Sequence, residues 1–307
     1  MRTIGDVCSE YISMLDKAGI SDARLEVFKM LSELTGKSRL MLETDRNSEW
    51  VFDEKLSAKF DECIRRRAQK EPAAYILGEQ YFFNEKYKCG KGVLIPRPDT
   101  EILVEKAIEE VTSKASKTQK VRVFDFCTGT GCIGISVTNA LLKAGFKGET
   151  YLIDIDDTAL SYARDNCGAA LTEYAEKLFD VKVIKADILD VDGILKLAGD
   201  GDFYTIILSN PPYITEEDMK QLDDDVLLYE PSKALYGGNI EGTKFYVALA
   251  DIACRILKDG EKILTEHGYD QGLKVRGIFE KAGLKDSVTY KDYGGNDRVT
   301  AALKTKG

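Results

Sequence analysis

The sequence VRVFDFCTGTGCIG, residues 121–134, decides the fold of this 307-residue chain. Its first half is rich in apolar residues, as a buried strand is, and a helical pattern begins after Gly131. Between the two, glycines allow the backbone to turn sharply and to approach a ligand closely. The stretch therefore predicts a strand, a ligand-binding turn and a helix, which together form the first crossover of an α/β domain.

The same succession of strand and helix continues along the chain. Strands are predicted at Val121–Cys127, Tyr151–Ile155, Val181–Ala186, Tyr204–Leu208 and Lys262–Thr265, and helices at 132–144, 157–171 and 243–258. Such alternation predicts a doubly wound sheet that holds its ligand at the carboxyl ends of the strands. Two later strand-like runs have no helix between them and predict a terminal antiparallel hairpin, at Ser287–Tyr290 and Arg298–Leu303.

Residues 1–75 carry a helical pattern with almost no strand signal. Apolar residues recur at helical spacing from Ile4 to Leu15 and from Leu25 to Leu34, and Gly36 is a stop signal. A third stretch, 52–69, ends in three arginines at 65–67, which we interpret as a solvated helix face rather than a partner contact. A small helical bundle is expected here.

Residues 76–100 are expected to link this bundle to the α/β domain. Two short apolar runs, Tyr81–Phe83 and Val93–Ile95, are separated by polar residues and glycines, as in a β-hairpin. Prolines and Thr100 then precede a periodic run from Ile102 and indicate the start of a helix. The α/β domain is therefore taken as residues 101–307.

The composition narrows the classes of protein. A hydrophobic content of 44% supports a real core, and a net charge of −9 disfavours an extended nucleic-acid footprint. No apolar run approaches the ~18 residues that span a bilayer, and no signal-peptide core is visible, so a cytoplasmic protein is expected. The seven cysteines contain no Cys-x-x-Cys pair and are interpreted as reduced thiols. Since His267 is the single histidine, we expect no metal site.

The turn after the first strand carries the cofactor signal. Asp154 ends the second strand at the spacing of a ribose-binding acid, and Asp187 ends the third, where adenine could lie. Asp125 either contacts the cofactor or only caps the turn. Three glycines match the pattern G-x-G-x-x-G, at Gly129, Gly131 and Gly134. This arrangement suits a nicotinamide cofactor and equally S-adenosylmethionine (SAM), so the residues alone leave both open.

A second chemical signal follows the fourth strand, at Asn210-Pro211-Pro212-Tyr213. Methyl transfer to an amide or aromatic amine needs acceptors that grip the nitrogen's hydrogens and aim it at the methyl group. The side-chain oxygen of Asn210 and the carbonyl of Pro211 can supply them, and Tyr213 offers a ring for stacking. The paired prolines stiffen the loop. The alternative is a Pro-Pro turn with a capping asparagine that only closes a strand.

Five motifs together resemble those of the HemK/PrmC family of SAM-dependent methyltransferases, and the resemblance covers about residues 5–303. They are EPAAYILG at 71–78, VLIPRPDTE at 93–101, NPPYI at 210–214, EPSKALYGG at 230–238 and GNDRV at 295–299. The family methylates the side-chain nitrogen of the glutamine in the Gly-Gly-Gln loop of class I peptide chain release factors. The resemblance implies a class I, Rossmann-like methyltransferase domain with a seven-stranded mixed sheet, preceded by a helical substrate-recognition domain and a β-hairpin linker.

The resemblance also implies roles for single residues. The glutamine pocket would be formed by Asn210, Pro211, Pro212 and Tyr213. SAM would be bound by Asp125, Cys127, Thr128, Gly129, Thr130, Gly131, Asp154, Asp187, Ile188 and Asn210. Cys127 departs from the glycine that many members have, and Ile188 from a frequent aromatic residue. His267 stands at a position that is often aliphatic, which argues against a catalytic role.

The implied mechanism is an in-line displacement without a strong base. The sulfonium already activates the methyl group, so the protein aligns the glutamine nitrogen and excludes water. The methylated nitrogen is briefly cationic and acidic, so its proton leaves afterwards, and no residue is assigned as general base.

Other functions remain open on the sequence. Asn-Pro-Pro-Tyr also serves N6-adenine methyltransferases of nucleic acids, which flip the base, although the acidic balance opposes this. A nicotinamide oxidoreductase or a non-catalytic nucleotide-binding module would leave Asn-Pro-Pro-Tyr unexplained. A glutamine methyltransferase that acts on a ribosomal protein is the closest rival, and the uninterrupted IPRPDTE, residues 95–101, favours release factors by resemblance.

An acidic segment follows the proposed pocket. Residues 216–230 hold seven carboxylates against one lysine, Lys220. The segment is either a solvated loop or a rim that steers the basic surface of a release factor inward and turns nucleic acid away.

Overall fold

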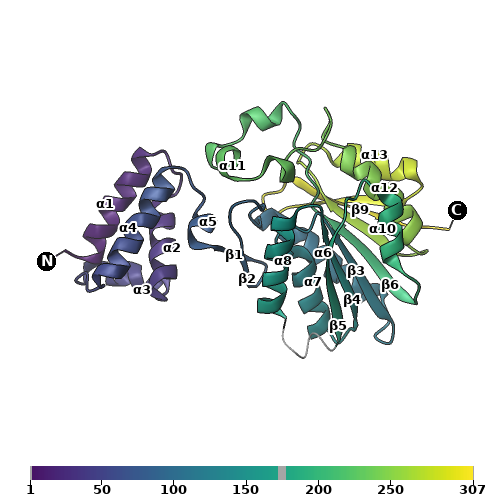
Figure 1. The fold of residues 1–307 in the computed structure, drawn as a ribbon, viewed down its shortest axis with the longest axis horizontal. Coiled ribbons are helices and arrows are strands. Elements are labelled where there is room, and N and C mark those ends of the chain that lie inside the picture. Colours follow the sequence, from purple (N-terminus) through teal and green to yellow (C-terminus); the bar gives the residue numbers. More distant parts are fainter. Residues whose placement is uncertain (1, 172–177, 307) are drawn as a thin grey trace. The chain divides into compact units, whose positions relative to one another are not determined.

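The computed structural model describes residues 2–171 and 178–306, and its contacts divide the chain into two compact units (Figure 1). The first comprises Met1–Glu79 together with Asp223–Tyr229, and the second comprises Gln80–Leu222 and Glu230–Gly307. Across the described ranges, no helix is both long and apolar enough to cross a membrane.

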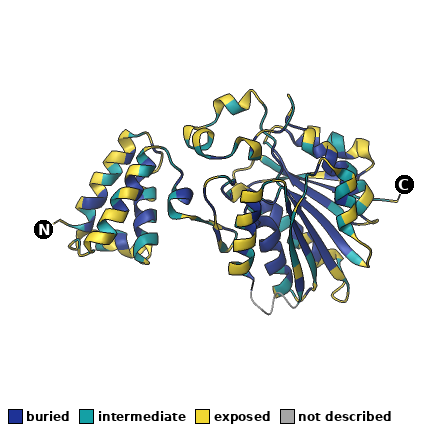
Figure 2. Ribbon diagram, viewed as in Figure 1, coloured by how far each residue is buried: buried dark blue, intermediate teal, exposed yellow. Residues whose placement is uncertain are grey.

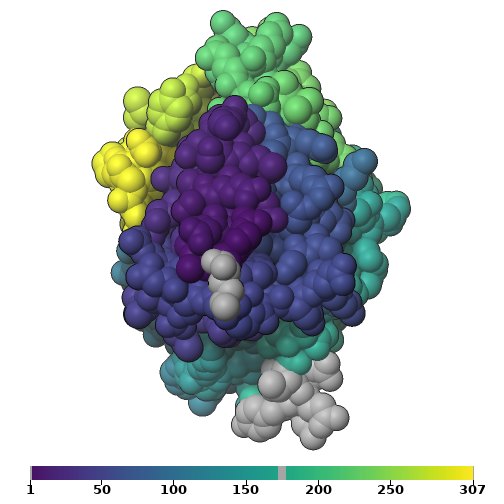
Figure 3. Space-filling model, turned by 90° about the vertical axis from the view of Figure 1, so that its left-hand side faces the viewer, coloured from purple at the N-terminus to yellow at the C-terminus, as the bar shows by residue number. Residues whose placement is uncertain are grey.

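The first unit is a helical bundle that follows the predicted periodicity. Its main helices are α1 (Ile4–Lys17), α2 (Ala23–Thr35), α3 (Arg39–Thr44), α4 (Glu54–Ala68) and α5 (Ala73–Leu77). Thr3 and Asp6 form a capping box at the start of α1, and Gly36, at φ +68°, ends α2 as predicted. The apolar faces, dark blue in Figure 2, meet in a core that includes Leu15, Val27 and Phe60. Figure 3 shows one face of this unit as a space-filling surface, with α1 in purple.

The three arginines of α4 are not a simple solvated face, so that interpretation is wrong for Arg67. Its side chain is 6% exposed and pairs with Glu26 and with Asp225 of α11 (Asp224–Tyr229). The Tyr229 hydroxyl of α11 also donates to the carbonyl of Gln69 at 2.8 Å. Both partners of the buried Arg67 are far from it in sequence, so helical periodicity cannot reveal them.

The predicted hairpin forms, but its second strand lies elsewhere. The two-stranded sheet pairs β1 (Glu79–Phe82) with β2 (Glu85–Lys88), and Val93–Ile95 is not a strand. In β2 only Tyr87 is buried, so the polar strand gave a weak pattern, whereas Val93 and Ile95 are buried as parts of a loop.

The second unit contains the seven-stranded mixed sheet that was expected. Its strand order is β5-β4-β3-β6-β7-β9-β8, and only β9 runs antiparallel to its neighbours β7 and β8. The strands are β3 (Lys120–Phe126), β4 (Gly148–Asp154), β5 (Phe179–Lys185), β6 (Phe203–Ser209), β7 (Lys262–Glu266), β8 (Lys285–Lys291) and β9 (Asp297–Leu303). The predicted terminal antiparallel hairpin, β8–β9, is confirmed.

Helices cover both faces of this sheet and divide its core into two apolar clusters. One cluster joins the sheet to α6 (Glu101–Lys114), α7 (Cys132–Lys143) and α8 (Asp157–Ala170), and the other joins it to α10 (Val191–Ala198), α12 (Lys244–Ile256) and α13 (Gly272–Ala282). The sequence did not predict α10 and α13, whose internal glycines weaken the helical signal.

The strand order indicates where along the sheet a ligand is expected to bind. Chain order reverses between β3 and β6, and ligands of doubly wound sheets bind at this reversal, outside the carboxyl ends. The register pairs Phe126 with Ser209, and the Ser209 hydroxyl donates to the Phe126 carbonyl at 2.8 Å. The glycine turn and the Asn-Pro-Pro-Tyr loop therefore leave the sheet side by side.

Candidate functional site

A cavity lies at the carboxyl ends of β3, β4 and β6, and all of its lining residues belong to the second unit. It brings together eight residues that the sequence assigned to cofactor binding: Cys127, Thr128, Gly129, Thr130, Asp154, Asp187, Ile188 and Asn210. Pro212 also lines it. Four other assigned residues are not among those that line it: Asp125, Gly131, Pro211 and Tyr213.

The glycine turn owes its shape to left-handed backbone at alternate positions. Cys127, Gly129 and Gly131 have φ values of +57°, +55° and +83°. A side chain at the first position is therefore strained, whereas a glycine would not be. Burial raises the pKa of the Cys127 thiol well above its usual value, so the thiol stays protonated.

Asp125 holds the turn from below. Its Oδ2 accepts hydrogen bonds from the Thr128 hydroxyl at 2.5 Å and from the Gly134 amide at 3.0 Å. Burial raises its pKa to about 7. These bonds are those of a turn cap, and direct contact between Asp125 and a cofactor stays a prediction.

Asp154 reaches the cavity from the end of β4. Its Oδ2 accepts from the Gly129 amide at 2.9 Å and its Oδ1 from the Asp156 amide at 3.0 Å. Burial raises the pKa of the carboxyl, and these backbone bonds act in the opposite direction. Because an ionised carboxylate can accept about four hydrogen bonds, both oxygens keep capacity for a ligand.

The part of the cavity near Asp187 is apolar. Ile188 is 4% exposed, and the apolar side chains of Ile155, Leu189 and Phe245 also line the cavity. Phe245 comes from α12 and was not anticipated, since nothing in its local sequence marks it. Its ring gives the cavity an aromatic surface, which the aliphatic side chain of Ile188 does not provide.

The Asn-Pro-Pro-Tyr loop is oriented by three side chains from other motifs. Asn210 Nδ2 donates to the Thr100 hydroxyl at 3.3 Å, and the Tyr213 hydroxyl donates to Glu266 at 3.4 Å. Gln271 Nε2 donates to the Tyr213 carbonyl at 3.0 Å. Thr100 lies in the VLIPRPDTE motif, whereas Glu266 and Gln271 lie on either side of His267, and nothing in the sequence indicated this role for any of the three.

Tyr213 faces the interior of the unit. Its ring packs against the apolar cluster that contains Phe124 and Tyr246, and burial raises the pKa of its hydroxyl. The ring therefore supports the loop in this structure, and stacking on a substrate stays a prediction. Close packing continues beneath it, because a Cβ at Gly242, where φ is +65°, would lie 2.1 Å from the Tyr213 carbonyl oxygen.

His267 is a neutral structural residue. Its Nδ1 lies 2.8 Å from the Gly268 carbonyl and must carry the hydrogen, because a carbonyl only accepts. Its Nε2 then accepts from the Thr300 hydroxyl at 2.9 Å. Burial lowers the pKa of the imidazole, which favours this neutral form. His267 does not line the cavity.

The acidic segment divides into an exposed and an engaged part. Five carboxylates are exposed: Glu216, Glu217, Asp218, Asp223 and Asp224. Asp225 instead pairs with Arg67 in the first unit. Glu230 is buried in the second, where it pairs with Arg97 and accepts from the Ile95 amide at 3.2 Å.

The sheet order, the glycine turn, the acid that ends β4 and the amide-proline loop after β6 define a class I SAM-dependent methyltransferase. Residues 6–78 match the family described as "PrmC N-terminal domain". A release factor glutamine methyltransferase of Clostridium botulinum is 35% identical over 97% of this chain and 98% of its own length. The chain therefore belongs to the release factor glutamine methyltransferase family.

The chain is also similar to a second relative and to a solved structure. The release factor glutamine methyltransferase of Haemophilus influenzae is 33% identical, and the match covers 93% of each chain. Among solved structures, a SAM-dependent methyltransferase of Agrobacterium tumefaciens is 12% identical with a TM-score of 0.44, covering 74% of this chain and 70% of that one.

Proposed function

We propose that this protein transfers the methyl group of SAM to N5 of the glutamine side chain in the Gly-Gly-Gln motif of class I peptide chain release factors. Its family membership supports this function, since the curated relatives are named release factor glutamine methyltransferase. The observation that carries the proposal at the site is the orientation of Asn210, which lines the cavity while its Nδ2 is engaged by Thr100.

The residues of the cavity fit SAM. Two carboxylates, Asp154 and Asp187, can accept from hydroxyl and amino groups, and the apolar side with Phe245 suits a flat purine. The backbone of the glycine turn can approach the amino-acid end of the cofactor. When bound, SAM supplies a methyl group that its sulfonium already activates.

Asn210 and Pro211 would orient the glutamine. Because Thr100 takes a hydrogen of Nδ2, the hydrogen-bond network assigns the Asn210 amide and leaves Oδ1 as its acceptor. Oδ1 and the Pro211 carbonyl would each accept a hydrogen of the substrate NH2 group and turn the nitrogen towards the methyl donor. The positive charge on the methylated nitrogen makes it a strong acid, so no general base is required.

We assign release factor recognition to residues 1–75, with residues 76–100 as the linker to the catalytic domain. Release factors act during translation, so the reaction would take place in the cytoplasm. The acidic residues that remain exposed, from Glu216 to Asp224, carry the charge that a basic release factor surface would complement.

A labelled-methyl assay tests the substrate. The protein is incubated with labelled SAM and, separately, with a release factor, a ribosomal protein extract and duplex DNA, and the modified residue is located by mass spectrometry. We expect label on the Gly-Gly-Gln glutamine and none on a release factor in which that glutamine is alanine. Label on a ribosomal protein or on adenine instead would replace the proposed substrate.

A further inference from the structure

Glu266 ends β7 beneath the Asn-Pro-Pro-Tyr loop, and no step proposed above uses it. The residue is 2% exposed. Its Oε1 accepts from the Tyr213 hydroxyl at 3.4 Å, and within residues 2–171 and 178–306 its Oε2 has no hydrogen-bond partner. A carboxyl buried in this way costs free energy unless its surroundings stabilise one form of it. Such a group is expected at functional sites.

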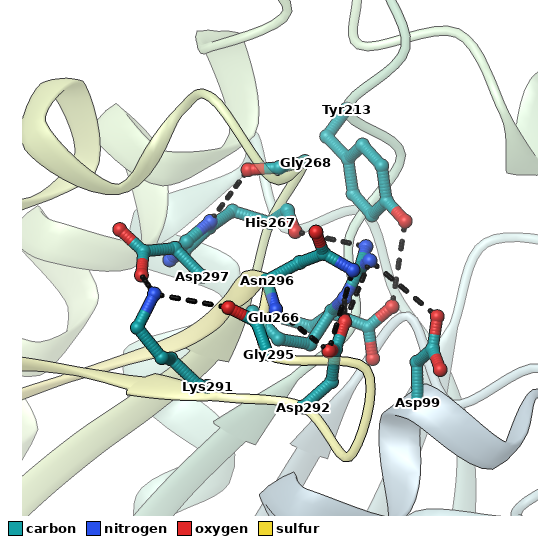
Figure 4. A network of polar contacts seen from close by, with 11 residues as sticks. Asp99, Tyr213, Glu266, His267, Gly268, Lys291, Asp292, Gly295, Asn296 and Asp297 are labelled. Atoms are coloured by element: carbon teal, nitrogen blue, oxygen red, sulfur yellow. Dashed lines mark hydrogen bonds and ion pairs between the residues drawn. The ribbon is translucent and has the colours of Figure 1, made fainter.

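The surroundings of Glu266 favour its charged form against the effect of burial. Burial raises its pKa to about 7, while the Thr100 hydroxyl and the positive charge of Arg298 act to lower it. Figure 4 shows the Tyr213 hydroxyl pointing at the carboxyl. The ionisable groups that influence Glu266 or are influenced by it come from five elements or loops: Asp99, Cys132, Tyr213, Tyr246 and Arg298.

Arg298 is held in place as the cation of this group. Its Nη2 lies 3.0 Å from Asp292 and 3.4 Å from Asp99, and its side chain is 13% exposed. Asp99 belongs to the same motif as Thr100, and Arg298 belongs to the GNDRV motif. Three of the motifs that the sequence singled out, VLIPRPDTE, NPPYI and GNDRV, therefore contribute residues around this carboxyl.

We propose that Glu266 is a positioning residue for methyl transfer, which draws the Thr100 and Tyr213 hydroxyl hydrogens towards itself so that Asn210 Oδ1 is held for the substrate. Thr100 is the connecting link, because an oxygen that accepts from Asn210 Nδ2 has its hydrogen available for another acceptor. The inference rests on the proposed function, since it assigns a residue to that reaction.

Protonation of Glu266 would reverse this arrangement. A carboxylate only accepts, whereas a carboxylic acid also donates, and its hydrogen would compete for the hydroxyl oxygen that accepts from Asn210. The carboxylate is therefore the active form. Activity should be full above the pKa of Glu266 and fall as the pH decreases through about 7.

Glu266→Gln tests this step because it keeps the shape and removes the ionisation. Single-turnover rates with saturating SAM and release factor are measured from pH 5.5 to 9. We expect the variant to lose on the order of tenfold in kcat at high pH, with SAM affinity little changed. Its profile should lack the wild-type inflection near pH 7. That loss would assign the inflection to Glu266 rather than to Asp125, whose pKa is also about 7.

Glu261→Gln is the matched control. Glu261 is 3% exposed, directly precedes the other end of β7 and accepts from the Thr205 and Lys258 amides. Its replacement removes a buried carboxyl without touching the loop, so Tm can fall while the pH profile of kcat is retained. Equal profiles in both variants would reduce Glu266 to a structural role and overturn the inference.

Thr100→Val tests whether Glu266 acts on Asn210 through the Thr100 hydroxyl, rather than by stabilising the fold. If the two residues act in series, the double variant Thr100→Val, Glu266→Gln should be no slower than the slower single variant, whereas multiplying effects would contradict the inference. Should Glu266→Gln fail to fold, Thr100→Val alone decides, because an unchanged pH profile in that variant excludes the link. A wild-type enzyme that does not methylate release factor contradicts the proposed function instead.

Discussion

The turn after β3 and the loop after β6 leave neighbouring strands and line one cavity, but they are held differently. The turn has local partners in addition to the more distant Asp154, and the loop is held only by distant side chains among the described hydrogen bonds. Asp125 stabilises the turn through partners three and nine positions away in sequence. The Asn-Pro-Pro-Tyr loop is held by residues 53, 58 and 110 positions away. A local turn can be recognised in a sequence because its partners are part of the motif, whereas the loop acquires its geometry only after the sheet has assembled.

The turn and the loop therefore have different structural requirements. The turn needs particular backbone conformations, which glycine and short polar side chains supply locally. The loop needs side chains aimed to within a fraction of an ångström, which packing and hydrogen bonds from several elements supply. Substitutions in the two regions should therefore affect different steps.

The largest effect is expected for Asn210→Ala. Loss of a preorganised acceptor should lower kcat by ~10²-fold or more and leave SAM affinity nearly unchanged. Single-turnover kinetics and calorimetry measure the two quantities. Asn210→Asp keeps an acceptor and adds a charge that can attract the sulfonium, so SAM binding should tighten while turnover still falls. Wild-type turnover in Asn210→Ala would remove the loop from the reaction.

Asp154→Ala should act on the other region. Removal of a charge-assisted bond to a ribose hydroxyl costs about 1.5–3 kcal/mol, so SAM should bind roughly 10- to 150-fold more weakly. Calorimetry measures the SAM affinity of the variant and of the parent protein, and the NAD affinity of the parent protein. Asp157→Ala is a suitable control, since Asp157 is exposed and pairs with Lys185 outside the cavity. Unchanged SAM affinity, or tighter binding of NAD by the parent protein, would contradict the cofactor assignment.

Gln271→Ala probes the long-range support of the loop. The substitution removes the donor to the Tyr213 carbonyl and should lower kcat for release factor by about 3- to 10-fold, the effect of one lost neutral hydrogen bond. SAM affinity should hold, because Gln271 does not line the cavity. Equal losses in SAM binding and turnover would mean that the turn and the loop are not separable.

The smallest effect is expected for Cys127→Gly. Glycine relieves left-handed strain of about 1–2 kcal/mol, and the greater freedom of the unfolded chain offsets most of it. The net change in the free energy of unfolding should stay within about 1 kcal/mol. Cys132→Gly, at the first position of α7, should destabilise more, because it removes a buried side chain and weakens a helix. Urea titrations compare the two, and a larger loss at Cys127 would contradict the role of φ.

Much of the fold could be predicted because each strand of the sheet carries its own pattern. Strand-like runs from 121 onward alternate with helical stretches, as in a doubly wound sheet, and β3 to β9 lie near the predicted positions. The second strand of the hairpin was misplaced, since in Glu85–Lys88 a single side chain, Tyr87, is buried. Periodicity needs several buried residues to be visible.

The features of the site likewise divide into those that a local sequence pattern reveals and those that it does not. The sequence by itself determined the positions of the glycine turn, of the acids at the end of β4 and just after β5 and of the Asn-Pro-Pro-Tyr loop, because each motif encodes local backbone geometry and a chemical group. Only the tertiary structure decided that Phe245 borders the cavity and that Thr100 and Glu266 orient Asn210 and Tyr213. These roles depend on contacts between residues far apart in the chain, and such contacts exist only once the strands have paired and their helices have packed.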